Sequence, residues 1–149
     1  MDLNGSNTNI LSSDTEIATL LRETRSIAVL GIKPESHSSQ PAFYVPQYMQ
    51  KVGYRIVPVP VYYPDVSRIL GERVYRSVAE IPFEIDMVNV FRRPEDLKAH
   101  IDDILRKRPR SVWLQLGISN PQAEEIFAHS GIKVVRDLCL MVEHRALVA

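Results

Sequence analysis

Short apolar runs alternate with stretches of helical periodicity along most of this chain, and this alternation restricts the fold more than any other feature. The apolar runs are residues 26–32, 54–59, 86–91, 111–116 and 132–135. The helical stretches are residues 42–52, 94–107, 121–129 and 138–147. Strands that are apolar on both faces are typical of parallel sheets covered by helices, and helices between them form right-handed crossovers. The sequence therefore predicts a three-layer, doubly wound Rossmann-like α/β fold with a five-stranded, mainly parallel sheet.

The chain length of 149 residues suits one domain. Residues 1–13 are rich in Asn and Ser and offer little apolar surface, so we expect a flexible N-terminal tail there. A helix that starts at Asp14 then opens a single domain of residues 14–149. The least regular stretch is 62–80, where we expect a loop with a helical turn near 66–70.

Charge and cysteine content exclude several function classes. Eighteen basic residues balance eighteen acidic ones, so the chain has no net field for holding nucleic acid or a membrane surface. No apolar stretch approaches the roughly 18 residues of a membrane span. Cys139 is the single cysteine, and the four histidines lack metal-ligand spacing. We expect a cytoplasmic protein with no nucleic-acid or membrane partner and no metal site.

In doubly wound folds the ligand crevice lies beyond the carboxyl ends of the strands. After the first strand, Gly31 permits a tight turn, and a helix begins near Pro41. The free N–H groups of this helix start and the side chain of Lys33 would therefore lie together at the crevice. This arrangement would bind phosphate oxygens. The same segment is also explained as an ordinary strand–helix turn whose serines cap the helix, and the residues alone leave both explanations open.

Two polar residues at other strand ends have two explanations each. Arg92 precedes a helix N-terminus, where positive charge is unfavourable, and either meets phosphate in the crevice or is offset by Glu95 and Asp96. Gln115 lies in an apolar strand and is either a ligand contact or a hydrogen-bonded core group.

Known nucleotide and catalytic motifs are missing from the sequence. The first loop has only one glycine of G-x-G-x-x-G, and no P-loop is present, so NAD binding and ATP hydrolysis are disfavoured. Cys139 and His144 are five residues apart and would lie on different faces of a helix. We therefore predict that Cys139 is a buried core residue and that the chain is not an enzyme on its own.

Six segments in order resemble the small stand-alone CoA-binding proteins, which are similar to the N-terminal CoA-binding domain of succinyl-CoA synthetase alpha chains. The segments are IAVLGIK, PAFYVPQYM, GYRIVPVPV, DMVNVFRRPE, VWLQLGISNP and GIKVVRDLCLMVEH. The resemblance covers residues 27–147. It implies a Rossmann-like fold that binds CoA or acyl-CoA without catalysing a reaction, since the phosphorylated histidine of the ligase relatives lies in a second domain that this chain lacks.

The resemblance also implies the site residues. The loop after the first strand holds the CoA phosphates, the stretch after the second lies near adenosine, and the ends of the third and fourth flank the pantetheine and diphosphate. The matching residues are Gly31, Ile32, Lys33, Val59, Pro60, Val61, Phe91, Arg92, Gln115, Leu116 and Gly117.

Two positions depart from the pattern of the family. Many relatives have Arg where this chain has Gln40, and many read V-N-P where it has Val59-Pro60-Val61. Loss of a cation beside phosphate costs about 1.5–3 kcal/mol, which is roughly tenfold to a hundredfold in affinity. The alternatives are an enzyme or regulatory subunit with another nucleotide-like ligand, or a ligand-free interaction module. A protein partner or homo-oligomer also stays open.

Overall fold

A computed structural model describes residues 8–149 of the chain. Five strands form one sheet in which every neighbouring pair is parallel. They are β1 (Ser26–Leu30), β2 (Arg55–Val59), β5 (Met87–Val90), β6 (Ser111–Leu114) and β7 (Lys133–Val135), in the order β2-β1-β5-β6-β7. The predicted α/β fold with a five-stranded parallel sheet is confirmed.

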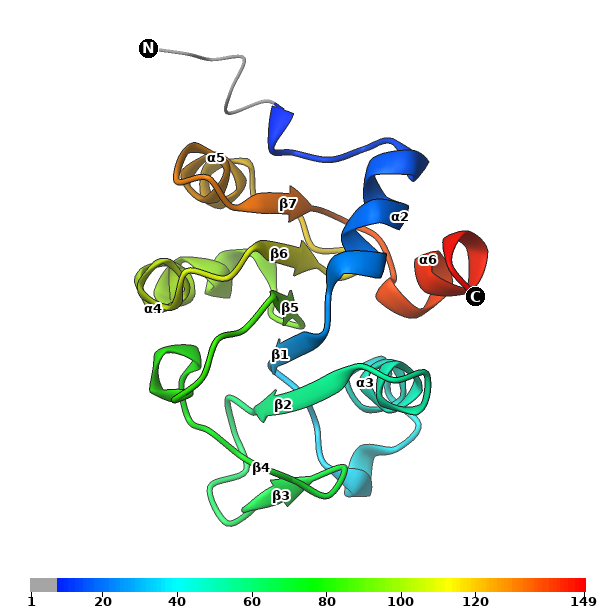
Figure 1. Cartoon of the computed structure of the whole chain (residues 1–149). Coiled ribbons are helices and arrows are strands. Elements are labelled where there is room, and N and C mark those ends of the chain that lie inside the picture. The colour runs from blue at the N-terminus through cyan, green and yellow to red at the C-terminus, as the bar shows by residue number, and fades with distance from the viewer. Residues whose placement is uncertain (1–7) are drawn as a thin grey trace.

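Helices cover both faces of the sheet and make a three-layer structure (Figure 1). One face carries α2 (Asp14–Glu23), α3 (Pro41–Lys51) and α6 (Leu140–Leu147), and the other carries α4 (Ile101–Lys107) and α5 (Pro121–His129). Side chains of β1 alternate between two apolar cores: Ile27 and Val29 join the α2–α3–α6 core, while Ala28 and Leu30 join the α4–α5 core. Because successive side chains point into one apolar core and then the other, each strand is a nearly continuous apolar run in the sequence.

The strand order reverses direction once, between β1 and β5. From β1 the chain passes outward to β2, and it then returns to place β5 on the other side of β1. The connections that leave β1 and β5 therefore run to opposite sides of the sheet. A crevice opens between their carboxyl ends, which is where doubly wound folds bind ligands.

The stretch between β2 and β5 differs from the prediction. Instead of a helical turn near residues 66–70, β3 (Arg68–Ile69) and β4 (Glu72–Arg73) form a short antiparallel hairpin. Its two turn residues, Leu70 and Gly71, both have positive φ, of 55° and 76°. Two-residue turns with positive φ at both positions match the right-handed twist of the strands that they connect. A glycine at the second position allows the chain to adopt this turn.

Two boundaries also differ. Of the expected flexible tail, residues 1–7 lie outside the described residues, but Ile10 pairs with Val134 of β7 and Leu11 is buried. These two apolar residues fix the chain to the sheet edge, so its packed part starts before Asp14. The predicted helix 94–107 begins as a 3-10 helix, η3 (Pro94–His100), and continues as α4. Among the described residues, no helix is both long and apolar enough to cross a membrane.

Candidate functional site

An open pocket with a volume of about 460 Å³ lies at the carboxyl ends of β1, β5 and β6, where the strand order reverses. Its lining comes from the loops after these strands, the start of α3 and the residue before α6. The lining residues are Gly31, Lys33, Gln40, Pro41, Ala42, Tyr44, Phe91, Arg92, Arg93, Pro94, Gln115, Leu116, Gly117, Ile118 and Cys139. We call it the crevice pocket.

At the crevice pocket, the ends of β1 and β5 lie in close contact. Gly31 has φ of +90°, and a β-carbon on it would collide with the carbonyl oxygen of Phe91. The N–H of Gly31 donates to Val59 O at 2.9 Å, and the N–H of Phe91 donates to Leu30 O at 2.8 Å. Only glycine fits between these strand ends, at the turn that the sequence predicts there.

Lys33 is held toward the start of α3. Its ammonium group donates a hydrogen bond to the side-chain oxygen of Gln40, and its own N–H donates to Ala42 O at 3.1 Å. Gln40 is the N-cap residue of α3, yet its side chain does not bond to the helix backbone. The residue that departs from the family pattern therefore orients the cation at the pocket wall.

Arg92 lies in the pocket wall at the end of β5, with its side chain 28% exposed. Its Nε donates to Nε2 of His100 at 3.3 Å, and its Nη2 lies 3.7 Å from a carboxylate oxygen of Asp96. The same oxygen of Asp96 accepts from Nε of Arg93 at 2.9 Å. Arg92 therefore lines the pocket, and the neighbouring carboxylate of Asp96 offsets its charge.

These charges shift the pKa values of two neighbours. Burial, and then the nearby charge of Arg92, lower the pKa of His100 below its ordinary value. The hydrogen bond from Arg93 lowers the pKa of Asp96. Around neutral pH the site thus combines a neutral imidazole, an ionised carboxylate and two guanidinium groups.

Gln115 borders the pocket but is only 4% exposed. Its Oε1 accepts hydrogen bonds from the N–H of Leu140, the first residue of α6, at 3.3 Å and from Nδ2 of Asn89 at 3.4 Å. This side chain thereby caps the start of α6 from inside the sheet. In the structure Gln115 is a hydrogen-bonded core group at the edge of the crevice pocket.

The remaining predicted site residues divide between the pocket and the core. Leu116 is 66% exposed at the rim, and Gly117 beside it donates its N–H to Oδ1 of Asp137 at 2.6 Å. Four predicted residues do not line the pocket: Ile32, Val59, Pro60 and Val61. The side chain of Ile32 is buried in the α2–α3–α6 core, that of Val59 is buried in the α4–α5 core, and Pro60 is also buried. Val61 is exposed outside the lining.

Sequence reasoning missed Cys139 as a pocket residue. It is half-buried instead of fully buried, packs against the α2–α3–α6 core, and lies at the N-cap of α6 in the pocket lining. Since β7 is parallel to its neighbours, the chain after it also starts from the carboxyl edge of the sheet, and this could have indicated the position. His144 is separate: its Nδ1 lies 2.8 Å from the Tyr48 hydroxyl, between α6 and α3.

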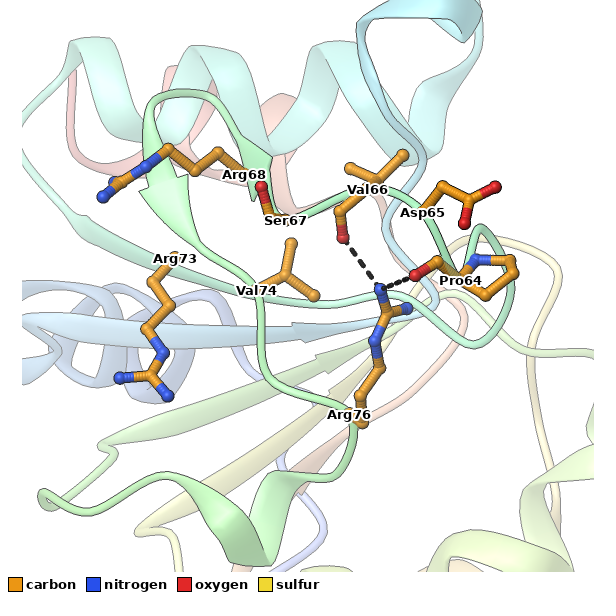
Figure 2. Close-up of a pocket in the computed structure, with 8 residues that line it drawn as sticks. All are labelled: Pro64, Asp65, Val66, Ser67, Arg68, Arg73, Val74 and Arg76. Carbon is orange, nitrogen blue, oxygen red and sulfur yellow. Dashed lines mark hydrogen bonds between the residues drawn. The ribbon is translucent and has the colours of Figure 1, made fainter.

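A second open pocket of about 430 Å³ lies beside the β3–β4 hairpin (Figure 2). Arg76 donates to the carbonyl oxygens of Tyr62, Tyr63, Pro64 and Val66 at 2.8–3.2 Å. Figure 2 shows its guanidinium directed at the loop backbone, while Arg68 and Arg73 point away from it. The hydrogen bonds of Arg76 thus stabilise a loop, and this pocket is separate from the crevice pocket.

Within the crevice lining that the structure describes, every charged side chain is positive: Lys33, Arg92 and Arg93. Apolar side chains, among them Phe91, Leu116 and Ile118, form much of the remaining wall. No cluster of His, Cys, Asp or Glu suited to a metal ion occurs among residues 8–149. A ligand that joins anionic groups to a narrow apolar part matches this lining.

Comparisons with known proteins point in the same direction. A sequence family described as "CoA binding domain" matches residues 25–145. The uncharacterized protein YneT of Bacillus subtilis is 34% identical over 132 residues, which are 89% of this chain and 94% of YneT. The structure of the Thermus thermophilus protein ID.343 superposes with a TM-score of 0.83 and 39% identity, covering 91% of this chain and 99% of that one.

A larger protein shares the fold. The dinucleotide-forming acetyl-coenzyme A synthetase 1 of Ca. Korarchaeum cryptofilum, solved in complex with phosphate and ADP, gives a TM-score of 0.62 at 19% identity. The match covers 78% of this chain and 27% of the synthetase.

Proposed function

The chain belongs to the CoA binding domain family, and from this premise we propose that it binds CoA or an acyl-CoA in the crevice pocket without catalysing a reaction on its own. The cytoplasm, where CoA metabolism supplies this ligand, is the compartment that we propose for it.

The observation that carries this proposal is the charge of the pocket lining. Lys33, Arg92 and Arg93 supply three positive charges to the described lining, and the carboxylate of Asp96, which pairs with both arginines, lies outside that lining. CoA carries its negative charges on phosphates, which cationic side chains and helix N-termini bind. We place the diphosphate between Lys33 and Arg92, next to the first turn of α3.

The pantetheine arm needs an apolar surface with few polar groups. Phe91, Leu116 and Ile118 provide such a surface after β5 and β6, and Tyr44 of α3 also lines the pocket. The arm would leave the pocket beside Leu116, whose side chain is largely exposed and available for contact. For adenosine we keep the expectation from the family resemblance, the segment Val59–Val61 after β2, which lies outside the pocket lining.

A non-catalytic role is the simplest proposal for this set of residues. The described lining has neither histidine nor carboxylate to act as a general acid or base. Its reactive side chains are Cys139, Lys33 and Tyr44, and a CoA-dependent activity that is lost in Cys139→Ser would overturn the non-catalytic role.

Isothermal titration of CoA tests the proposal, with NAD as the ligand control. Arg92→Gln should weaken CoA binding by about tenfold or more, because a phosphate loses a charge-assisted hydrogen bond. Arg110→Gln is the matched control, since Arg110 is an exposed arginine directly before β6, at the opposite edge of the sheet. Equal affinities for all three proteins would remove Arg92 from the site, and absence of CoA binding to the wild type would reject the function.

A further inference from the structure

His100 contacts the side chain of Arg92 and is not itself part of the crevice pocket lining. It is the last residue of η3, eight residues after Arg92, and the turns of η3 bring it back against the arginine side chain. Its Nε2 accepts the Nε–H of Arg92 at 3.3 Å. This contact occupies the inner nitrogen of the guanidinium and leaves the two terminal nitrogens, one of which is 3.7 Å from Asp96.

The contact requires one particular form of the imidazole. Nε2 accepts a hydrogen bond only when the ring is neutral and carries its proton on Nδ1. Arg92, Asp96 and Asp103 are the charged groups that act on His100. Burial and the charge of Arg92 lower its pKa, which favours the neutral form that the contact needs.

We propose that His100 is a positioning residue for ligand binding: its neutral ring accepts the Nε–H of Arg92 and holds the terminal guanidinium nitrogens toward an anionic group in the crevice pocket. This inference rests on the proposed function, because it requires a phosphate-bearing ligand there. A guanidinium fixed at its inner nitrogen loses less conformational freedom when it binds phosphate through its outer ones. His100 thus raises affinity without contacting the ligand.

A merely structural role for His100 makes a different prediction. If the residue only stabilises η3, its replacement should weaken binding by the same factor whether or not Arg92 is present, and any non-native side chain should do so. Positioning requires instead that the effect of His100 depends on Arg92. It also requires that another neutral acceptor of suitable length restores the contact.

The test is a double-mutant cycle read by CoA titration at pH 7.5. His100→Ala should weaken CoA binding about fivefold, and His100→Gln, whose side-chain oxygen replaces Nε2 as acceptor, should stay within about twofold of the wild type. In an Arg92→Gln background, His100→Ala should cause no further loss beyond about twofold. Thermal melts of each variant confirm that it is folded.

Two results would overturn the inference while CoA binding itself stands: equal losses for the Ala and Gln variants of His100, or an undiminished effect of His100→Ala without Arg92.

A ligand-free measurement separates the two proposals. The ¹⁵N shifts of the His100 ring should show an unprotonated Nε2 in the free protein, and a protonated Nε2 would overturn the inference. If the wild type binds no CoA, the proposed function fails and the positioning role fails with it, whatever the ring shows.

Discussion

Gly31 packs against the carbonyl of Phe91 so closely that no β-carbon fits between them. This contact joins the ends of β1 and β5 at the reversal of the strand order, and both residues line the crevice pocket.

Replacement of Gly31 by alanine should lower the free energy of unfolding by about 2–4 kcal/mol, because the new methyl group must displace backbone and the residue must keep a positive φ. Gly131→Ala is the matched control: its φ of +86° is close to the +90° of Gly31, but nothing lies within 4 Å of its added β-carbon. The free energy of unfolding of the control should fall by only about 1–2 kcal/mol, because alanine is unfavourable at a positive φ. Urea unfolding curves give both values. Equal losses in the two variants would mean that the backbone at Phe91 shifts to admit the methyl group without lowering the free energy of unfolding.

Gln40→Arg should bind CoA more tightly, by about tenfold, because it adds a cation beside the proposed phosphate position. The hydrogen bond between Lys33 and Gln40 is lost in this variant, which limits the gain. Gln122→Arg is the control, since Gln122 is exposed on α5 outside the pocket lining and the substitution changes the net charge equally. Calorimetric titration compares the three proteins. A gain of the same size in the control would show a general charge effect in place of a local one.

Stability should fall as the pH drops below about 6.5, the ordinary pKa of histidine. Burial lowers the pKa of His144 in the folded protein, and burial together with Arg92 lowers that of His100. The unfolded chain then binds protons that the folded chain does not, so the stability present above pH 6.5 is lost as the pH falls toward the folded pKa values. Each group contributes at most about 1.4 kcal/mol per pH unit.

Urea unfolding at pH 7.5, 6.5 and 5.5 measures this slope. His144→Gln should reduce this slope, because it removes one of the two groups whose pKa burial lowers. A flat profile for the wild type between pH 7.5 and 5.5 would contradict the assignment of His144 as a buried neutral residue.

Much of the fold follows from periodicity, because strands buried on both faces leave a strong apolar signal and their order along the chain restricts the sheet. Side-chain direction at strand ends was harder to predict. Ile32 and Val59 lie near the crevice along the chain, yet their side chains enter the two apolar cores. The crevice at Gly31 could be predicted because doubly wound folds have their crevice at the carboxyl ends of the strands, and Gly31 directly follows the first strand.

Contacts between distant or irregular segments explain the rest of the misses. Gln115 caps α6 through a hydrogen bond with Leu140, 25 residues away. Periodicity and short motifs describe neighbouring residues, so they do not predict such a bond. His100 meets Arg92 at the end of η3, a 3-10 helix, where the periodicity predicted one regular α-helix over residues 94–107. The β3–β4 hairpin was missed because two-residue strands are too short to show an alternation.

Amide NMR spectra of the ¹⁵N-labelled chain, recorded during a CoA titration, test the central claim most directly. We predict saturable shifts for the amides of Gly31, Lys33 and Gly117 at the carboxyl edge of the sheet, and none on addition of NAD. The absence of saturable shifts at millimolar CoA would contradict binding. Shifts centred on the hairpin residues Arg68 and Arg73 would contradict the location of the site in the crevice pocket.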